Sequence, residues 1–222
     1  MYRVLKIKRD FVNTLLLASH PKSTLTIDSE AINKRLAQKA RVENRFLHWF
    51  SGFTDAEGNF LISIDRKYVK LRFKICLHID DLRTLQVIQS NLNIGRVTEE
   101  KNMNRCSFIV EDISGITTIC SIFNIYPLHT SKKLDFNSFY EAYLIKINNK
   151  NLSDTNLDQI LFLKNNMNSK RVIFTYNTTS QIIINPDWFI GFIEGEGTFG
   201  IKTGSSLYLQ VAQKNTSQEC LV

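Results

Sequence analysis

Two neighbouring stretches of the chain, residues 60–64 and 70–78, alternate between apolar and polar side chains. In the second stretch every other residue from 71 to 77 is apolar, and the residues between them are mostly basic. A period of two is typical of a strand with one face in the core and the other in solvent. We therefore expect a hairpin that carries a row of cations on its outer face.

The pattern changes to a helical period after this hairpin. Asp80 or Asp81 can cap a helix over residues 82–92, whose apolar residues share one side and which Gly95 ends. Residues 96–110 then predict a second hairpin, because two short runs of strand-forming residues flank a polar turn.

Three more helices are expected after the second hairpin. Asp112 can open the first, a longer one follows Pro127, and Ser153 can cap the last, which ends near Met167. With a helix before the first hairpin, the order is helix, two strands, helix, two strands and further helices. This order predicts an α+β fold.

An internal repeat is the most informative feature of the sequence. Residues 48–60 resemble residues 187–199 without a gap, at a spacing of 139 positions (Glu196 minus Glu57). Both copies contain a Trp-Phe pair, small residues, two acids and a Gly-polar-Phe ending. Self-similarity at a fixed spacing indicates that one structural unit occurs twice.

Each copy places small residues four positions apart on one face of its expected helix. They are Gly52 and Ala56 in the first copy, and Gly191 and Gly195 in the second. Small residues at this spacing let two helix backbones approach closely. We therefore expect the two motif helices to pack against each other through these residues.

Glu57 and Glu196 stand at the C-terminal ends of the two helices, each before a glycine. An acid is unfavourable there, by ~0.3–1 kcal/mol, because the helix dipole places partial negative charge at that end. Close helix packing would also bring the two carboxylates together. Carboxylates with neighbouring carbonyl oxygens suit Mg²⁺. A single such acid is usually only solvated, but the duplication favours a metal site.

The composition favours an anionic partner. Lys and Arg number 28 against 21 Asp and Glu, for a formal charge of +7, which makes nucleic acid the first candidate and leaves a solvated basic surface as the alternative. The four cysteines and four histidines are scattered, which argues against a zinc site or a disulfide scaffold. No apolar run approaches the ~18 residues that span a bilayer, so we expect no membrane partner.

Residues 50–58 and 189–197 resemble the nine-residue motif that names the LAGLIDADG family of homing endonucleases. In that motif the metal-binding acid takes the eighth place, which is Glu57 in one copy and Glu196 in the other. The resemblance implies two αββαββα repeats related by a pseudo-twofold axis. It also implies a saddle of antiparallel sheets over the major groove of double-stranded DNA.

The resemblance implies the chemistry of the site as well. The two acids, with the carbonyl groups of Gly58 and Gly197, would hold Mg²⁺ or Mn²⁺, and water activated by the metal would hydrolyse each strand. Asp55 and Glu194, at the sixth place of the motif, would support the helix ends and would not bind the metal.

Two further catalytic residues follow from the resemblance. Gln213 matches a glutamine that helps hold the catalytic water, whereas the equivalent place in the first repeat is Leu77 and departs from the pattern. Lys132 is the better match, and Lys133 the next, to a lysine after a Pro-Leu turn that stabilises charge at the phosphate.

DNA contacts are expected on the exposed faces of the strands and their turns, where basic and polar side chains can reach phosphates or base edges. The candidates are Arg66, Lys67, Lys70, Arg72, Lys74, His78, Lys202, Gln210 and Lys214. The alternative is a solvated sheet face, because lysines also protect sheet edges from aggregation.

The expected organisation has one complete and one partial repeat. With an offset of 136, Val222 matches position 86, so the equivalents of residues 87–168 are missing from the second copy. Three explanations are open: a truncated or decayed reading frame, a partial sequence, or a homodimer formed through the complete first repeat in place of the monomer of intact family members. We favour the first two. The expected segments are an N-terminal extension (1–45), the first repeat (46–168), a linker (169–186) and the second repeat (187–222).

The function that the resemblance implies is a site-specific double-strand DNA endonuclease encoded in an intron. One alternative is an RNA maturase that assists splicing of a group I intron, and another is a DNA-binding remnant that does not cleave. Members of the family are typically encoded in organellar introns, so we expect the mitochondrion, with the chloroplast as second choice.

Overall fold

The computed structural model describes residues 29–174, 183–202 and 206–213, with side chains from residue 35 onward. Its larger sheet is antiparallel, in the spatial order β1-β2-β4-β3, and confirms both expected hairpins. The strands are β1 (Gly58–Asp65), β2 (Tyr68–His78), β3 (Arg96–Glu100) and β4 (Arg105–Val110).

The described part of the chain has six α-helices. Their combination with antiparallel strands confirms the α+β class. None of the described helices is long and apolar enough to cross a membrane. They are α1 (Ser29–Glu57), α2 (Leu82–Leu92), α3 (Ile113–Ile125), α4 (Lys132–Asn148), α5 (Asp154–Asn165) and α6 (Pro186–Glu196), with 3₁₀ turns η2 (Ile79–Asp81), η3 (Lys101–Met103) and η4 (Asn168–Lys170).

Side-chain caps explain where two of the helices begin. The Asp112 carboxylate accepts a hydrogen bond of 2.8 Å from the backbone N–H of Gly115 at the start of α3. The Ser153 hydroxyl accepts one of 3.1 Å from the backbone N–H of Asn156 at the start of α5. Both caps confirm the sequence predictions, because each satisfies an N–H group that has no partner within its helix.

Helix α2 departs from its expected ends. Neither Asp80 nor Asp81 makes a side-chain cap at its start; the chain enters the helix through η2, where the His78 ring accepts a hydrogen bond from Asp80 N. The helix stops at Asn93, which adopts a left-handed conformation with φ 53°, whereas Gly95 (φ 66°) lies in the turn to β3. Asparagine tolerates this conformation better than most side chains, so it can end a helix as glycine does.

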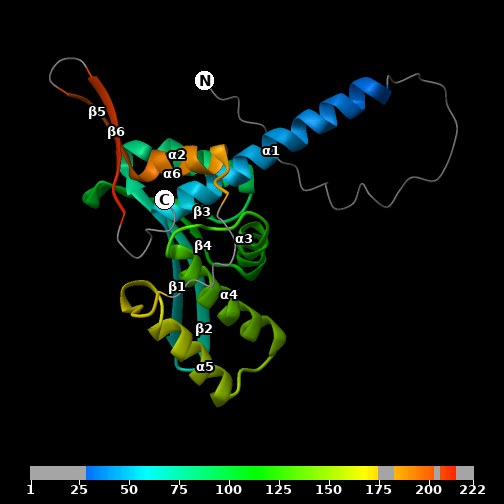
Figure 1. Cartoon of the computed structure of the whole chain (residues 1–222). Coiled ribbons are helices and arrows are strands. Elements are labelled where there is room, and N and C mark those ends of the chain that lie inside the picture. The colour runs from blue at the N-terminus through cyan, green and yellow to red at the C-terminus, as the bar shows by residue number, and fades with distance from the viewer. Residues whose placement is uncertain (1–28, 175–182, 203–205, 214–222) are drawn as a thin grey trace, which may run out of the picture.

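Helix α1 begins at Ser29, and no break in secondary structure marks the expected boundary at residue 45. Residues 29–45 contain no glycine or proline and are rich in Ala, Arg, Lys and Glu, which are good helix formers. Figure 1 shows this first part of α1 projecting beyond the rest of the molecule. The motif helix of the first repeat is therefore the C-terminal end of a much longer helix.

The core of the first repeat is an aromatic cluster between the sheet and helices α3 and α4. Phe60, on β1, is fully buried, and its ring centroid lies 5.3 Å from those of Phe73 and Phe139. Phe123 of α3 and Phe136 of α4 complete the cluster. Aromatic rings at such separations contribute both large buried area and favourable edge contacts, so this cluster anchors the sheet that carries the site.

The second repeat contributes α6 and a hairpin of β5 (Gly197–Lys202) and β6 (Ser206–Val211). Its register repeats that of the first repeat, because Gly58 pairs with Ile75 and Gly197 pairs with Val211. The hairpin projects from the body in Figure 1, and Phe199, the equivalent of Phe60, is 71% exposed.

Candidate active site

Helices α1 and α6 pack with their backbones in direct contact. A Cβ atom added at Gly52 would lie 1.8 Å from the carbonyl oxygen of Trp188, and one added at Gly191 would lie 2.0 Å from that of Trp49. No side chain fits at either place, because both obstacles are backbone atoms. The close approach expected from the spacing of small residues is therefore observed.

The same contact continues toward the C-terminal ends of the helices. A Cβ atom at Gly195 would lie 2.4 Å from Cβ of Ala56 and 3.1 Å from Cγ of Glu57. All four small residues predicted for the interface thus lie in it: Gly52 and Gly191 each meet the backbone of the other helix, and Gly195 faces Ala56. Because they admit no larger side chain, Glu57 and Glu196 come to the same end of the helix pair.

The electrostatics of Glu57 reflect this crowding. Burial raises the pKa of the Glu57 carboxyl, the Lys132 ammonium opposes that rise, and the carboxylates of Glu196 and Asp81 add to it. Three carboxylates therefore share one region with a single lysine. Asp81 was not predicted from the sequence as a neighbour of the site, since it belongs to the turn after β2.

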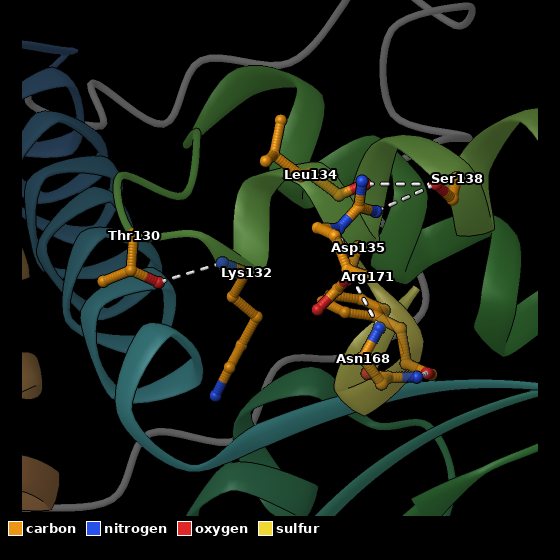
Figure 2. Close-up of polar contacts among 8 residues, drawn as sticks. Thr130, Lys132, Leu134, Asp135, Ser138, Asn168 and Arg171 are labelled. Atoms are coloured by element: carbon orange, nitrogen blue, oxygen red, sulfur yellow. Dashed lines mark hydrogen bonds and ion pairs between the residues drawn. The ribbon is translucent and has the colours of Figure 1, made fainter. Parts of the chain in front are cut away.

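Lys132 lies at the first turn of α4 and reaches the end of α1. Its Nζ donates a hydrogen bond of 2.9 Å to the carbonyl oxygen of Ala56, and Figure 2 shows its side chain extending away from α4. Burial lowers the pKa of the Lys132 ammonium, while the carboxylates of Asp55, Glu57 and Glu196 oppose that shift. Lys133, the second candidate, is exposed.

Asp55 is a buried hub of hydrogen bonds. It accepts bonds from His129 N (2.7 Å), Thr130 N (3.1 Å), Thr130 Oγ1 (2.6 Å) and, across the helix interface, Trp188 Nε1 (3.0 Å). Burial raises the pKa of the Asp55 carboxyl, and the hydrogen bonds from Thr130 and His129 oppose that rise. This arrangement matches the supporting role expected for the acid at the sixth place of the motif.

The equivalent acid of the second repeat makes the reciprocal contact. Glu194 accepts a hydrogen bond of 2.9 Å from Nε1 of Trp49. A tryptophan of each motif helix therefore donates a hydrogen bond to the acid at the sixth place of the other motif. Arg45 adds an ion pair of 3.0 Å with Asp187 at the opposite end of α6. Sequence reasoning missed both tryptophan contacts, although Trp49 and Trp188 recur at the repeat spacing of 139.

Two carboxylates at this site could hold a divalent cation. No group of three or more His, Cys, Asp or Glu side chains that could hold a metal occurs in the part of the chain that the structure describes. Mg²⁺ needs no such group, because it keeps several waters and takes one or two carboxylates together with substrate phosphate oxygens. Glu57 and Glu196, near the negative ends of two helix dipoles, fit that donor set.

The outer face of the sheet carries most of the predicted cations of the first repeat. Strand β2 buries Val69, Leu71, Phe73 and Ile75 and turns the residues between them outward. Lys70 and Arg72 are exposed and Lys74 is partly exposed. His78 lies at the exposed end of β2, and Arg66 and Lys67 form the exposed β1–β2 turn.

Two arginines on this face, Arg96 of β3 and Arg105 of β4, were not predicted. Arg96 and the predicted Arg72 of β2 both bind Glu111, at 2.6 Å each, and Arg105 binds Glu100 at 2.7 Å. The hydrogen bond from Arg96 lowers the pKa of the Glu111 carboxyl, and Arg72 adds to the effect. Their signal in the sequence is weak, because β3 buries none of its residues and β4 buries three in a row, Cys106, Ser107 and Phe108.

The remaining candidates lie on the hairpin of the second repeat. Lys202 and Gln210 are exposed, whereas Lys214 lies outside the described residues. Because Val211 pairs with Gly197 as Ile75 pairs with Gly58, the register makes Gln213 the equivalent of Leu77. The two half-sites therefore differ at this position as the sequence alignment predicted.

Comparison with known proteins identifies the fold. The LAGLIDADG endonuclease family model matches residues 50–143. The uncharacterized mitochondrial protein RF1 of Saccharomyces cerevisiae is 32% identical over 157 residues, which cover 70% of this chain and 32% of that protein. The probable intron-encoded endonuclease Cox1-I1b of Schizosaccharomyces pombe is 32% identical over 167 residues, which cover 69% of this chain and 41% of that protein. The matched part of this chain thus spans less than half the length of each of these relatives.

A solved structure gives a further match. The LAGLIDADG homing endonuclease I-GzeII, crystallised in complex with its DNA target, is 30% identical with a TM-score of 0.68, covering 78% of this chain and 68% of that one. The chain belongs to the LAGLIDADG homing endonuclease family.

Proposed function

We propose that this chain forms the DNA-cleaving centre of a site-specific double-strand endonuclease. The observation that carries the proposal is the meeting of Glu57 and Glu196 at the ends of two helices in backbone contact, beside the half-buried Lys132. Relatives named as intron-encoded endonucleases and the I-GzeII complex with DNA support the same activity. The mitochondrion is the proposed location, because RF1 of Saccharomyces cerevisiae is named as a mitochondrial protein.

Glu57 and Glu196 would hold Mg²⁺ or Mn²⁺, with the carbonyl groups of Gly58 and Gly197 as further oxygen donors. When bound, the metal would polarise the scissile phosphates and activate water for in-line displacement. The charges of Glu57 and Glu196 favour a cation here, because carboxylates that lie near each other in a partly buried site repel one another.

Lys132 would stabilise the negative charge that develops on the phosphate. Its Nζ lies at the carbonyl oxygen of Ala56, next to Glu57, so its ammonium is held within the same region as the acids. Gln213 would orient the attacking water in the second half-site through its side-chain amide. Leu77 has no polar group for that task, so we propose that the first half-site cleaves its strand more slowly.

The outer face of the sheet would contact DNA. Four basic side chains can reach phosphates or guanine edges in the major groove. They are Lys70, Lys74, and Arg72 and Arg96, which both form ion pairs with Glu111. The side chains of the second hairpin, Lys202 and Gln210, would continue this face. Basic residues on this face predict binding that weakens steeply with salt, because phosphate contacts release counterions.

A direct test incubates the purified chain with Mg²⁺ and a randomised duplex library, and sequences the new ends. Glu57→Gln and Glu196→Gln run alongside as variants that keep shape and remove charge. Defined double-strand breaks in the wild type that both variants lose would support the proposal. Cleavage that persists in either variant would contradict the assigned roles of the two acids.

Leu77 supports a second candidate function, in which the chain binds DNA without cutting both strands. That function predicts salt-sensitive duplex binding, with nicks confined to the strand at the second half-site or with no breaks at all. Leu77→Gln then serves as the discriminating variant, since it should restore cutting of the other strand if only the water-orienting amide is lacking.

A further inference from the structure

Asp55 is the one acidic side chain among the buried residues that the structure describes, at 3% exposure. Two separate segments supply its hydrogen-bond donors. Residues 129–130 give three, and Trp188 of helix α6 gives the fourth. Burying a carboxylate costs free energy unless hydrogen bonds compensate. All four donors bind the same carboxylate, so each one helps to hold Asp55 in the position that the other donors need.

The segment bound by Asp55 leads directly into Lys132. The Thr130 hydroxyl donates to Asp55 and accepts a hydrogen bond of 3.2 Å from the backbone N–H of Lys132 (Figure 2). The Lys132 side chain then returns to α1 at Ala56. One continuous set of hydrogen bonds thus runs from Asp55 through Thr130 to Lys132, and back to the residue that follows Asp55.

Trp188 closes this set from the other repeat. Its ring is 2% exposed, stacks on Phe192 at 4.9 Å and meets the His129 ring edge-on at 5.0 Å. Its Nε1 is its one side-chain polar atom and donates to Asp55. The position of Trp188 on α6 is fixed by the backbone contact at Gly52, so the indole reaches Asp55 only when the two helices are docked.

We propose that the hydrogen bond from Trp188 to Asp55 makes the docking of the second motif helix a condition for placing Lys132 in the first half-site. Trp188 and Asp55 are positioning residues in this scheme, and neither touches the phosphate. The inference deepens the proposed function and rests on the role given there to Lys132. Its consequence is that a chain with an undocked α6 has neither its second acid nor a correctly placed lysine.

Lysine reactivity tests this coupling without DNA or metal. The wild type, Trp188→Phe and Trp49→Phe are treated with an amine-acetylating reagent, and the modification rate of each lysine is read by mass spectrometry. We expect Lys132 to react at least about tenfold faster in Trp188→Phe, because a hydrogen bond to a buried carboxylate is lost. In Trp49→Phe, the matched control for the exposed bond to Glu194, Lys132 should keep its wild-type rate.

Lys146 provides an internal reference on the same helix. Its Nζ donates a hydrogen bond of 2.8 Å to Val69 O, and this bond is separate from those that connect Asp55 with Lys132. An unchanged Lys132 rate in Trp188→Phe would overturn the proposal. So would an equal rise at Lys132 and Lys146, since that would mean general loosening of α4.

The wild-type protein gives a second measurement that needs no variant to fold. The chain has two tryptophans, so its NMR spectrum contains two indole N–H signals. We expect the Trp188 signal to exchange with deuterium at least about tenfold more slowly than that of Trp49, and equal rates would overturn the proposal. A protein that passes both tests and cleaves no DNA would contradict the proposed function and leave the coupling intact.

Discussion

The two motif helices present a tryptophan, a glycine and an acid to each other at equivalent positions, yet the repeats that carry them differ in most other contacts. Each helix sends a tryptophan to the other's acid and meets the other's backbone at a glycine. Asp55, however, accepts four hydrogen bonds, whereas Glu194 accepts one among the described residues.

The strands after the motifs show the same contrast. Phe60 is fully buried beneath α3 and α4, and its equivalent Phe199 is 71% exposed. Both hairpins nevertheless have the same register. Local sequence therefore determines that each hairpin forms and how its strands pair. Whether the side chains of the hairpin are buried depends on segments far along the chain.

Truncating the two equivalent phenylalanines should give the largest difference between the repeats. Phe60→Ala should lower the free energy of unfolding by about 3–5 kcal/mol, because it opens a cavity in the aromatic cluster. Phe199→Ala should change it by less than about 0.5 kcal/mol, since solvent already surrounds that ring. Urea denaturation of the wild type and both variants measures the two values, and similar losses would show that the second hairpin is covered in solution.

The glycine pair should behave alike in the two repeats. Gly52→Ala and Gly191→Ala should each destabilise the protein by about 3 kcal/mol, because each new methyl group meets a backbone carbonyl that cannot move aside. Gln38→Ala, on the exposed part of α1, is the control for the substitution of an alanine into this helix. Unfolding midpoints that stay at the wild-type value in either glycine variant would contradict the helix contact.

The two acids of the sixth place should differ in their contribution to stability. Asp55→Asn should cost about 2 kcal/mol, because an amide cannot accept all four hydrogen bonds and its N–H₂ group opposes the existing donors. Glu194→Gln, on an exposed face, should cost less than about 0.5 kcal/mol. Equal thermal shifts for the two variants would remove the asymmetry between the repeats.

The smallest expected effect concerns His129, which has no equivalent in the described part of the second repeat. Burial lowers the pKa of His129 to about 4. Its neutral form is favoured in the folded state, so stability is fully present above pH 6.5 and is lost as the pH falls toward 4. After allowance for its partial exposure, we expect about 1 kcal/mol of this loss to come from His129.

His129→Phe separates this effect from other titrating groups. The variant should change stability less steeply than the wild type between pH 6.5 and pH 4, while any loss of the ring contact with Trp188 adds a constant offset at all pH values. Parallel curves for the two proteins in denaturant titrations would rule out the buried, neutral imidazole.

The sequence predicted the elements of the first repeat well because their determinants are local. The alternation along β2 and the Asp112 and Ser153 caps each depend on a few consecutive residues, and all three are confirmed. The repeat also predicted the contact between the glycine faces. The start of α1 was missed because residues 29–45 form a helix by propensity, with no periodic apolar face to reveal it.

The site itself could be predicted only in part. Glu57, Glu196 and Lys132 followed from the motif and the family resemblance, and the structure brings them together. The bonds from Trp49 and Trp188 join residues 145 and 133 positions from their acids, and no local pattern encodes such partners. Arg96 was missed because its partner Glu111 lies on the far side of a hairpin.

The backbone contact between α1 and α6 limits how proteins with this helix pair can change during evolution. Since main-chain atoms and not side chains set the separation of the two helices, no repacking of the interface can change the distance between Glu57 and Glu196 by small steps. In the proposed endonuclease, the stagger between the two cuts is therefore a property of the fold. Substitutions on the outer face of the sheet can redirect the enzyme to a new target sequence and leave the geometry of the break unchanged.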